Sequence, residues 1–237
     1  MIGTLVNTAG IVAGGLCGHL FGKALKNRHQ ETLTMACGVS TLFIGVAGAM
    51  QQMLHNEAMP GGGAMLVVAC LALGGLIGEL INIERGFEAF GEWLKVRTGN
   101  ARDQGFVNGF VTASLTVCIG AMAIVGAIQD GLTGDWSTLG AKAILDLIIV
   151  MVMTCSLGKG CVFSAIPVLV WEGLLTLLAG ALKPIMTDLA MGYLSLVGNV
   201  LIFCVGLNLV WGKRIRVANL LPAVVLAVLA AYLPIGF

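Results

Sequence analysis

The residues of this sequence most able to do chemistry are polar side chains set within long apolar stretches. Glu172 lies about ten residues from each end of one such stretch, and Asn199 lies at the middle of the next. A charged side chain at the centre of a membrane-spanning helix costs about 2.5 to 3.5 kcal/mol on insertion scales. Two interpretations of Glu172 therefore remain open: a protonated carboxyl group in an interhelical hydrogen bond, or a carboxylate reached by water or a cation.

Other polar residues lie nearer the ends of their apolar stretches. Asn7 and Asp146 are each about one turn from an end, and Lys142 precedes Asp146 by the four residues that place an ion pair on one helix face. This spacing predicts an interfacial pair, and it leaves no basic residue at the depth of Glu172. The candidates for a substrate or ion pathway are therefore Asn7, Glu79, Asp146, Glu172 and Asn199.

The segment SLGKG offers a second kind of site, formed by the backbone. Gly158 and Gly160 flank Lys159 in this segment. Glycines there allow irregular backbone whose N–H or C=O groups could face an ion, provided that the backbone lines protein or water. Two arrangements remain open: a turn between two full spans, or two half-helices that meet inside the membrane with Gly158 and Gly160 in the pathway.

No motif in the sequence points to an enzyme. HExxH, the Walker A loop, GxSxG and GxGxxG are all missing. The seven cysteines lie in or beside apolar stretches without a CxxC, a pattern typical of small buried hydrophobes. The formal net charge of +1 gives no reason to expect a nucleic-acid partner. We therefore expect no catalytic activity, no cofactor, no metal site and no bound nucleic acid.

Composition shows which elements must position the polar residues. Of the 237 residues, 58% are hydrophobic and only 11% are charged, against about 25% charged in soluble domains. With a mean hydropathy of +0.97, this excludes a soluble protein and predicts an all-α, polytopic transmembrane helix bundle that forms one integral membrane domain over residues 1–237. The predicted spans number about eight and cover residues 2–22, 33–54, 64–82, 106–128, 143–158, 162–182, 189–211 and 217–235.

The basic residues predict an orientation. Of the 13 Lys and Arg, 11 fall in one set of alternate loops, and only Lys142 and Lys183 fall in the other. This places both termini on the outer side of the membrane and residues 83–105 on the cytoplasmic side. Within that connection, Ile83, Phe87 and Leu94 recur near helical spacing opposite charged residues, which predicts an amphipathic interfacial helix.

Glycines within the spans predict close helix packing. Gly10, Gly14, Gly18 and Gly22 recur every four residues, the spacing at which small residues let two backbones approach. GGLCGHL at 14–20 also resembles GGLIGEL at 74–80. Internal repeats of this kind are typical of transporter folds, in which the substrate site lies between the repeats.

Several longer motifs together resemble a known family. They are GTLVNTAGIVAGGLCGHLFG at 3–22, GGLIGELINIE at 74–84, CIGAMAIVGAIQDGLTGD at 118–135 and SLGKGCVFSAIP at 156–167. The chain is similar to the YqgA-type bacterial inner-membrane family, domain of unknown function 554. This resemblance implies a multi-pass protein of the bacterial inner membrane that is often labelled a possible transporter and has no established substrate. In that membrane the predicted orientation makes both termini periplasmic. It would highlight Asn7, Glu79, Asp130 and Asp146.

The sequence thus predicts a transporter or channel for a small solute or ion, with a proton or sodium ion as the candidate coupling species. A non-transporting membrane scaffold or sensor, acting through protein partners at the 84–105 connection, is the alternative. The lipid bilayer is the one certain partner of such a chain, and the sequence leaves homo-oligomerisation open.

Overall fold

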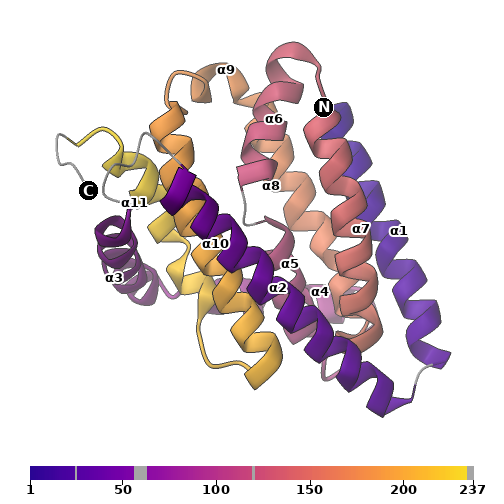
Figure 1. Cartoon of the computed structure of the whole chain (residues 1–237). Coiled ribbons are helices and arrows are strands. Elements are labelled where there is room, and N and C mark those ends of the chain that lie inside the picture. Colours follow the sequence, from indigo (N-terminus) through magenta and orange to yellow (C-terminus); the bar gives the residue numbers. More distant parts are fainter. Residues whose placement is uncertain (25, 56–62, 119–120, 234–237) are drawn as a thin grey trace.

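The computed structural model describes residues 1–24, 26–55, 63–118 and 121–233, and every regular element in these residues is helical (Figure 1). The long helices are α1 (Ile2–Ala24), α2 (Asn27–His55), α3 (Ala64–Ile81), α4 (Ile83–Arg97), α7 (Ser137–Leu157) and α10 (Asp188–Trp211). The shorter ones are α5 (Phe106–Cys118), α6 (Ala121–Thr133), η1 (Lys159–Ser164), α8 (Ala165–Leu177), α9 (Ala179–Leu182), η2 (Val217–Leu220) and α11 (Pro222–Ala230).

The predicted number of eight spans is not confirmed. Six segments are long and apolar enough to cross a membrane, and a seventh is added if α5 and α6, which bend by 61° at their junction, count as one span. The last predicted span, 217–235, contains an apolar helix only over Val217–Ala230, and residues 234–235 lie outside the described part of the chain. The sequence left open whether the stretches on either side of SLGKG are two full spans or two half-helices. The structure has α7 and the continuous η1–α8 segment there, and each is long enough for a full span.

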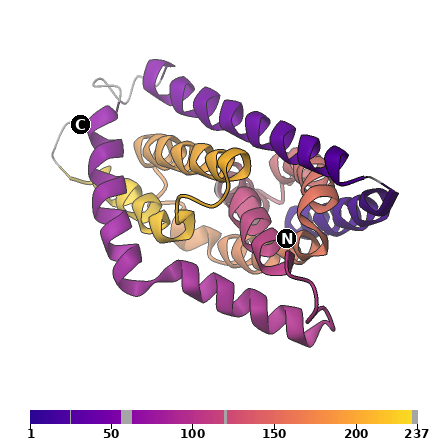
Figure 2. The same ribbon diagram turned by 90° about the horizontal axis from the view of Figure 1, so that it is seen from below.

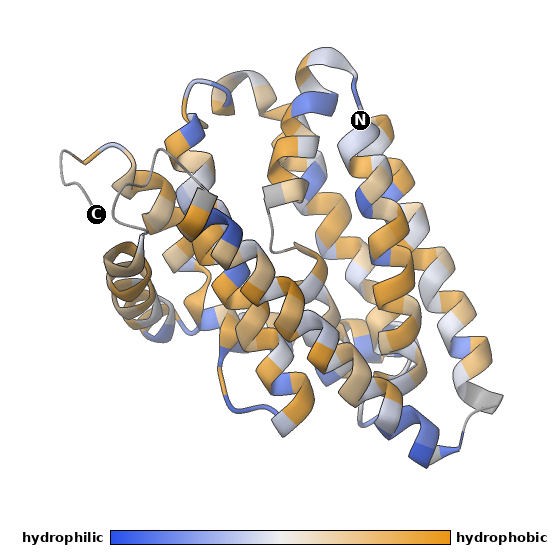
Figure 3. Cartoon of the chain, in the orientation of Figure 1, coloured by the Kyte–Doolittle hydropathy of each residue, from blue (hydrophilic) through white to orange (hydrophobic). Residues whose placement is uncertain are grey.

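The long helices run between two ends of the bundle. In Figure 1 the N-terminus, the α6–α7 connection and α9 lie at the top, whereas the end of α1, the start of α2 and the end of α10 lie at the bottom. Figure 3 shows hydrophilic residues gathered at these ends and connections, while hydrophobic residues cover most of the helices. Many of them face outward, such as Leu80, which is 81% exposed. Apolar surface on this scale requires a lipid environment.

Helices α3 and α4 depart from the direction of the others. In Figure 1 the helix α3 is seen nearly end-on. Figure 2 shows α3 and α4 meeting in an L shape beside the bundle. Asn82 forms the corner with φ 57°, a left-handed conformation that asparagine tolerates and that ends α3 before α4 begins. Gly78 of α3 packs closely on the backbone of Asn219 in η2, which fixes α3 to the C-terminal segment.

The regularly spaced glycines of α1 lie on α7. A Cβ atom added to Gly14 would come within 2.2 Å of the Leu147 carbonyl oxygen, and one added to Gly18 would come equally close to that of Met151. Gly10 and Gly22 meet Ala143 and Cys155 in the same way, so the contact repeats every four residues on both helices. The two helices therefore run parallel with their backbones in direct contact. This contact fixes the position of Asn7 relative to Asp146.

Candidate functional site

A buried ion-pair cluster joins α1, α5, α7 and α8. Lys142 and Asp146 of α7 form an ion pair, and the Lys142 Nζ also lies 3.6 Å from the Glu172 Oε1 on α8. Asn7 of α1 donates from Nδ2 to the same Glu172 oxygen at 2.8 Å. All four residues are almost fully covered: Asn7 is 0%, Glu172 1%, Asp146 4% and Lys142 6% exposed. We call these four residues the Lys142 cluster.

The helix boundaries explain why Lys142 and Asp146 lie so deep. The sequence predicted a span over 143–158, with Asp146 near its end, but α7 begins at Ser137. Asp146 is therefore close to the middle of a 21-residue helix. The expectation that no basic residue reaches the depth of Glu172 is wrong, because Lys142 lies inside α7 and extends to the Glu172 carboxylate.

The break between α5 and α6 supplies another ligand for Lys142. Its Nζ donates to the carbonyl oxygen of Val117 at 2.8 Å. Val117 is the penultimate residue of α5, and the last carbonyls of a helix lack partners within it and carry a partial negative charge. A helix that ends inside the bundle thus presents a site for a cation, and the ammonium group occupies it. Ile119 and Gly120 of the CIGA motif lie outside the described residues.

Two threonines extend the polar contact between α1 and α8. The hydroxyls of Thr4 and Thr176 are 3.2 Å apart, and Thr176 also donates to the backbone carbonyl of Glu172 at 2.8 Å. Thr4, Asn7, Glu172 and Thr176 therefore form one buried polar seam that continues into the Lys142–Asp146 pair. Such a seam holds the Glu172 side chain in one orientation.

The cluster is short of positive charge and of hydrogen-bond donors. Asp146 and Glu172 bring two carboxylates, and Lys142 brings one ammonium group. Asn7 Oδ1 and Glu172 Oε2 are buried and have no hydrogen-bond partner. Both atoms are acceptors when Glu172 is ionised, so the described residues leave a place for one additional proton or small cation.

Two cavities extend to Leu115 on α5, near the Val117 carbonyl that binds Lys142. One, of about 470 Å³, extends from Glu84 and Lys213 to Leu115 on α5, and it is lined partly by amide and hydroxyl groups. Glu84 and Lys213 lie at the end of the bundle where α4 and the segment after α10 carry many of the basic residues, which we call the basic end. The other, of about 650 Å³, is almost entirely apolar and reaches Leu115 and Cys118. Leu115 borders both cavities and lies two residues before Val117, the ligand of Lys142.

Comparison with known proteins identifies the family. The model of a family described as "Protein of unknown function (DUF554)" matches residues 2–232. The chain belongs to the DUF554 family. The uncharacterized membrane protein YdfK of Bacillus subtilis (strain 168) is 30% identical over 226 residues, which cover 95% of this chain and 93% of YdfK. The uncharacterized protein YqgA of Escherichia coli (strain K12) is 31% identical over 231 residues, covering 96% and 94%. No solved structure matches the chain.

The sequence-predicted site residues of this DUF554 protein separate into two groups. Asn7, Asp146 and Glu172 meet in the Lys142 cluster. Asn199 does not: its Nδ2 donates to the Ser195 carbonyl at 2.7 Å within α10, and Gly48 of α2 packs against its side chain. Glu79 lies at the basic end, where Asn219 donates to its Oε2 at 2.5 Å and Arg216 forms an ion pair with it.

Gly158 and Gly160 form a tight turn at the basic end of the bundle. Gly158 ends α7 with φ 91°, a conformation that side chains of L-residues rarely adopt. A Cβ atom on Gly160 would come within 2.0 Å of the Phe106 carbonyl oxygen at the start of α5. In the DUF554 structure Gly158 therefore has a conformational role and Gly160 a packing role. Asp130, which the family resemblance highlighted, accepts a hydrogen bond from the Gly3 backbone N–H at 3.0 Å and so joins α6 to α1.

Sequence reasoning missed Lys142 as the centre of the DUF554 site. Its position four residues before Asp146 was the available signal, but the predicted helix boundary placed the pair at the surface. Thr4 and Thr176 were missed because threonine is common in apolar helices, where its hydroxyl bonds to its own backbone. The Val117 carbonyl could not be found in advance, because only the bend between α5 and α6 frees it.

Proposed function

We propose that this DUF554 protein moves a small solute or ion across the bacterial inner membrane and that the Lys142 cluster binds the coupling proton or cation. The observation that carries the proposal is the buried cluster of two carboxylates and one ammonium group, with Glu172 Oε2 and Asn7 Oδ1 unpartnered. Intramembrane ionisable residues are expensive, and in membrane proteins they mark ion paths and proton relays. The proposal assigns no enzymatic activity to the chain.

A single proton would balance the charge of the cluster. Asn7 and Glu172 are already joined through Nδ2 and Oε1. A proton on Glu172 Oε2 turns this acceptor into a donor, and it removes the excess negative charge. A sodium ion between the two unpartnered oxygens would have the same electrostatic effect. Loss of the proton restores two carboxylates beside one ammonium group, so the cluster has two states of different charge.

The position of the 470 Å³ cavity favours exchange of protons or cations between the Lys142 cluster and the basic end of the bundle. The 470 Å³ cavity carries Asn108, Thr112 and Asn208 along its wall and ends at Leu115. We infer that protons or cations enter here and that Leu115 and Val117 separate the cavity from Lys142. With the basic residues on the cytoplasmic side, as their 11 to 2 division favours, this cavity opens to the cytoplasm and the N-terminal end faces the periplasm.

Proteoliposomes test the proposal directly. Vesicles that contain pyranine are given a potassium diffusion potential, and internal acidification is followed with and without sodium outside. We expect the wild-type protein to conduct protons or sodium faster than protein-free vesicles, and Glu172→Gln to lose this conductance while still folding. Glu79→Gln, which removes a carboxylate outside the cluster, is the matched control and should retain it. Wild-type rates equal to those of protein-free vesicles under both conditions would overturn the proposal.

A further inference from the structure

Two cavities are lined by residues of the corner between α3 and α4, and no residue of the Lys142 cluster lines either of them. A polar cavity of about 600 Å³ is lined by Asn82, Glu84, Arg85 and Glu88 from this corner and by residues 213–216 from the opposite segment. The apolar cavity of about 650 Å³, described above, is lined by Ile81, Ile83 and Phe87 of the same corner and by residues 221–222 and 224–226. The same two stretches of chain therefore wall a polar cavity and an apolar cavity side by side.

The polar cavity has an excess of positive charge. Its lining contains four basic residues and two acidic ones: Arg85, Lys213, Arg214, Arg216, Glu84 and Glu88. Lys213 pairs with Glu84 at 2.7 Å and with Glu88 at 2.5 Å. Partial burial acts to lower the pKa of Lys213. The hydrogen bonds that Lys213 donates to Glu84 and Glu88, together with the negative charges of these two residues, outweigh burial and raise the pKa above its ordinary value. Lys213 thus stays charged and pairs with both acids, balancing one of their two negative charges.

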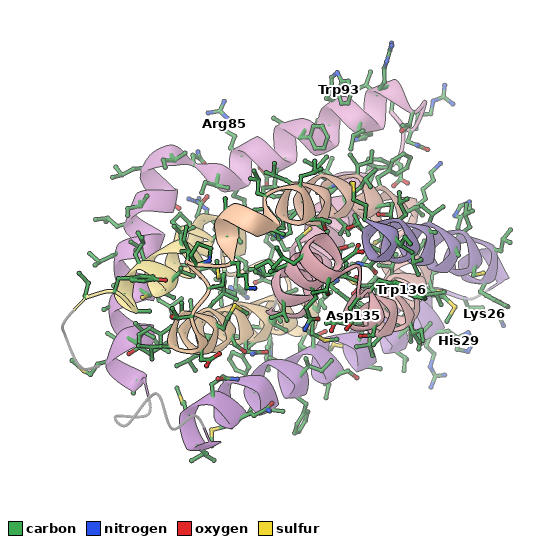
Figure 4. All side chains as sticks on the ribbon, turned by 90° about the horizontal axis from the view of Figure 1, so that it is seen from above. Lys26, His29, Arg85, Trp93, Asp135 and Trp136 are labelled. Atoms are coloured by element: carbon green, nitrogen blue, oxygen red, sulfur yellow. The ribbon has the colours of Figure 1, made fainter. Side chains whose placement is uncertain are left out.

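Two arginines of this cavity remain available to a ligand. Arg216 pairs with Glu79, whereas Arg85 and Arg214 form no ion pair within the described part of the chain. Figure 4 shows Arg85 projecting from α4 away from the bundle, where lipid headgroups would lie. Trp93, on the same helix, also projects outward and is 57% exposed. Tryptophan is enriched at the membrane–water interface, which fits the level of this corner.

The apolar cavity requires an apolar occupant. Its lining residues include Ile77, Val170, Leu174 and Val225, and they offer water almost no hydrogen-bond partner. Water does not fill a space of this size and character, because each molecule needs two to four polar partners. In a bilayer the available apolar molecule is a lipid acyl chain. A headgroup at the polar cavity and a chain in the apolar one would belong to one molecule.

We infer that the α3–α4 corner binds an anionic phospholipid, with its phosphate between Arg85 and Arg214 and an acyl chain in the cavity beside α3 and α11. Arginine suits this role because its planar guanidinium group binds phosphate oxygens in a bidentate manner. Basic pockets between membrane helices recognise anionic lipid headgroups by the same chemistry.

The test measures lipid affinity of the full chain in detergent micelles by native mass spectrometry. Phosphatidylglycerol, phosphatidylcholine and glycerol phosphate are the three probes. We expect the wild type to prefer phosphatidylglycerol over phosphatidylcholine, and Arg85→Gln with Arg214→Gln to weaken phosphatidylglycerol binding roughly 30-fold, which corresponds to about 2 kcal/mol. Arg97→Gln with Arg102→Gln removes the same charge from exposed positions outside the cavity and should leave the preference intact.

Further variants and outcomes separate the lipid from other ligands. Val225→Trp partly fills the apolar cavity, and it should weaken both phospholipids without changing the preference between them. Equal wild-type binding of the two phospholipids would overturn the inference. An equal loss in the Arg97 and Arg102 control would do so too, because it would reduce the preference to overall charge. Competition by glycerol phosphate at the affinity of the intact lipid would assign the site to a free phosphate group instead.

Discussion

At the scale of single residues, the Lys142 cluster depends on a balance of charges that is incomplete. Lys142 is the only ammonium group within reach of Asp146 and Glu172 among the described residues, and it is held by the Val117 carbonyl as well. In a low-dielectric interior, opposite charges stabilise each other strongly, but each also loses its hydration. The cluster is therefore sensitive to the loss of any one charge.

Lys142→Met is expected to destabilise the protein by about 3 to 5 kcal/mol, because it leaves two carboxylates buried without a counter-charge. Thermal unfolding in detergent measures this. Replacing both partners, as Lys142→Met with Asp146→Leu, should recover most of the loss, since a buried ion pair can often be exchanged for apolar groups. Lys95→Met is the control: its partner Glu92 is exposed at the surface, so the cost should stay below about 1 kcal/mol. A Lys142→Met protein as stable as the wild type would contradict the charge balance described above.

At the scale of helices, the contact between α1 and α7 fixes the geometry of the site. Asn7 reaches Glu172 only because the glycine face of α1 lies directly on the backbone of α7, beside α8. A methyl group at this contact must push the two helices apart. The resulting shift would also separate the Asn7 amide from the cluster.

Gly14→Ala should lower the free energy of unfolding by about 1 to 3 kcal/mol, because its Cβ would meet the Leu147 carbonyl oxygen at 2.2 Å. Gly86→Ala is the matched control on α4, where a Cβ would meet nothing within 4 Å. This second change should be neutral or stabilise the protein by up to about 1 kcal/mol, since alanine favours helix. Chemical denaturation in mixed micelles measures both. Equal effects of the two substitutions would show that α1 and α7 are not in close contact.

The helices were largely predictable from the sequence, and their ends were not. Apolar stretches of about 20 residues gave the positions of α1, α2, α3 and α10, and the amphipathic pattern after Ile81 gave α4. The start of α7 was misplaced because Ser137 to Lys142 is polar in composition but helical in structure, and depth was inferred from composition alone. The bend between α5 and α6 could not be predicted from a proline, because residues 106–133 contain none.

Part of the candidate site was predictable for a physical reason. Glu172, Asp146 and Asn7 stand out because carboxylates and amides within apolar stretches are costly. Asn199 met the same criterion, yet it satisfies its amide N–H within its own helix, an outcome that hydropathy cannot distinguish. Which polar residues meet depends on contacts between helices that are distant in sequence, such as α1 with α8. Single-sequence patterns do not contain those contacts.

At the scale of the whole molecule, the two ends of the bundle should face different compartments. Asp135 is exposed in the α6–α7 connection (Figure 4). Arg97 is exposed at the end of α4. In a variant lacking the native cysteines, Asp135→Cys should react with a membrane-impermeant maleimide added to intact spheroplasts. Arg97→Cys should react only after the membrane is permeabilised. Labelling of both from outside would contradict the inferred orientation.

The most direct test of the central claim measures whether Glu172 exchanges a proton within the folded protein. Infrared difference spectra between mildly acidic and mildly alkaline buffers report the C=O stretching band of a buried carboxylic acid. We predict such a band in the wild type and in Glu79→Gln, and its loss in Glu172→Gln. If sodium binds the same oxygens, adding sodium at constant pH should weaken the band. A wild-type spectrum that Glu172→Gln leaves unchanged would mean that Glu172 does not exchange a proton, and it would contradict the proposed coupling site.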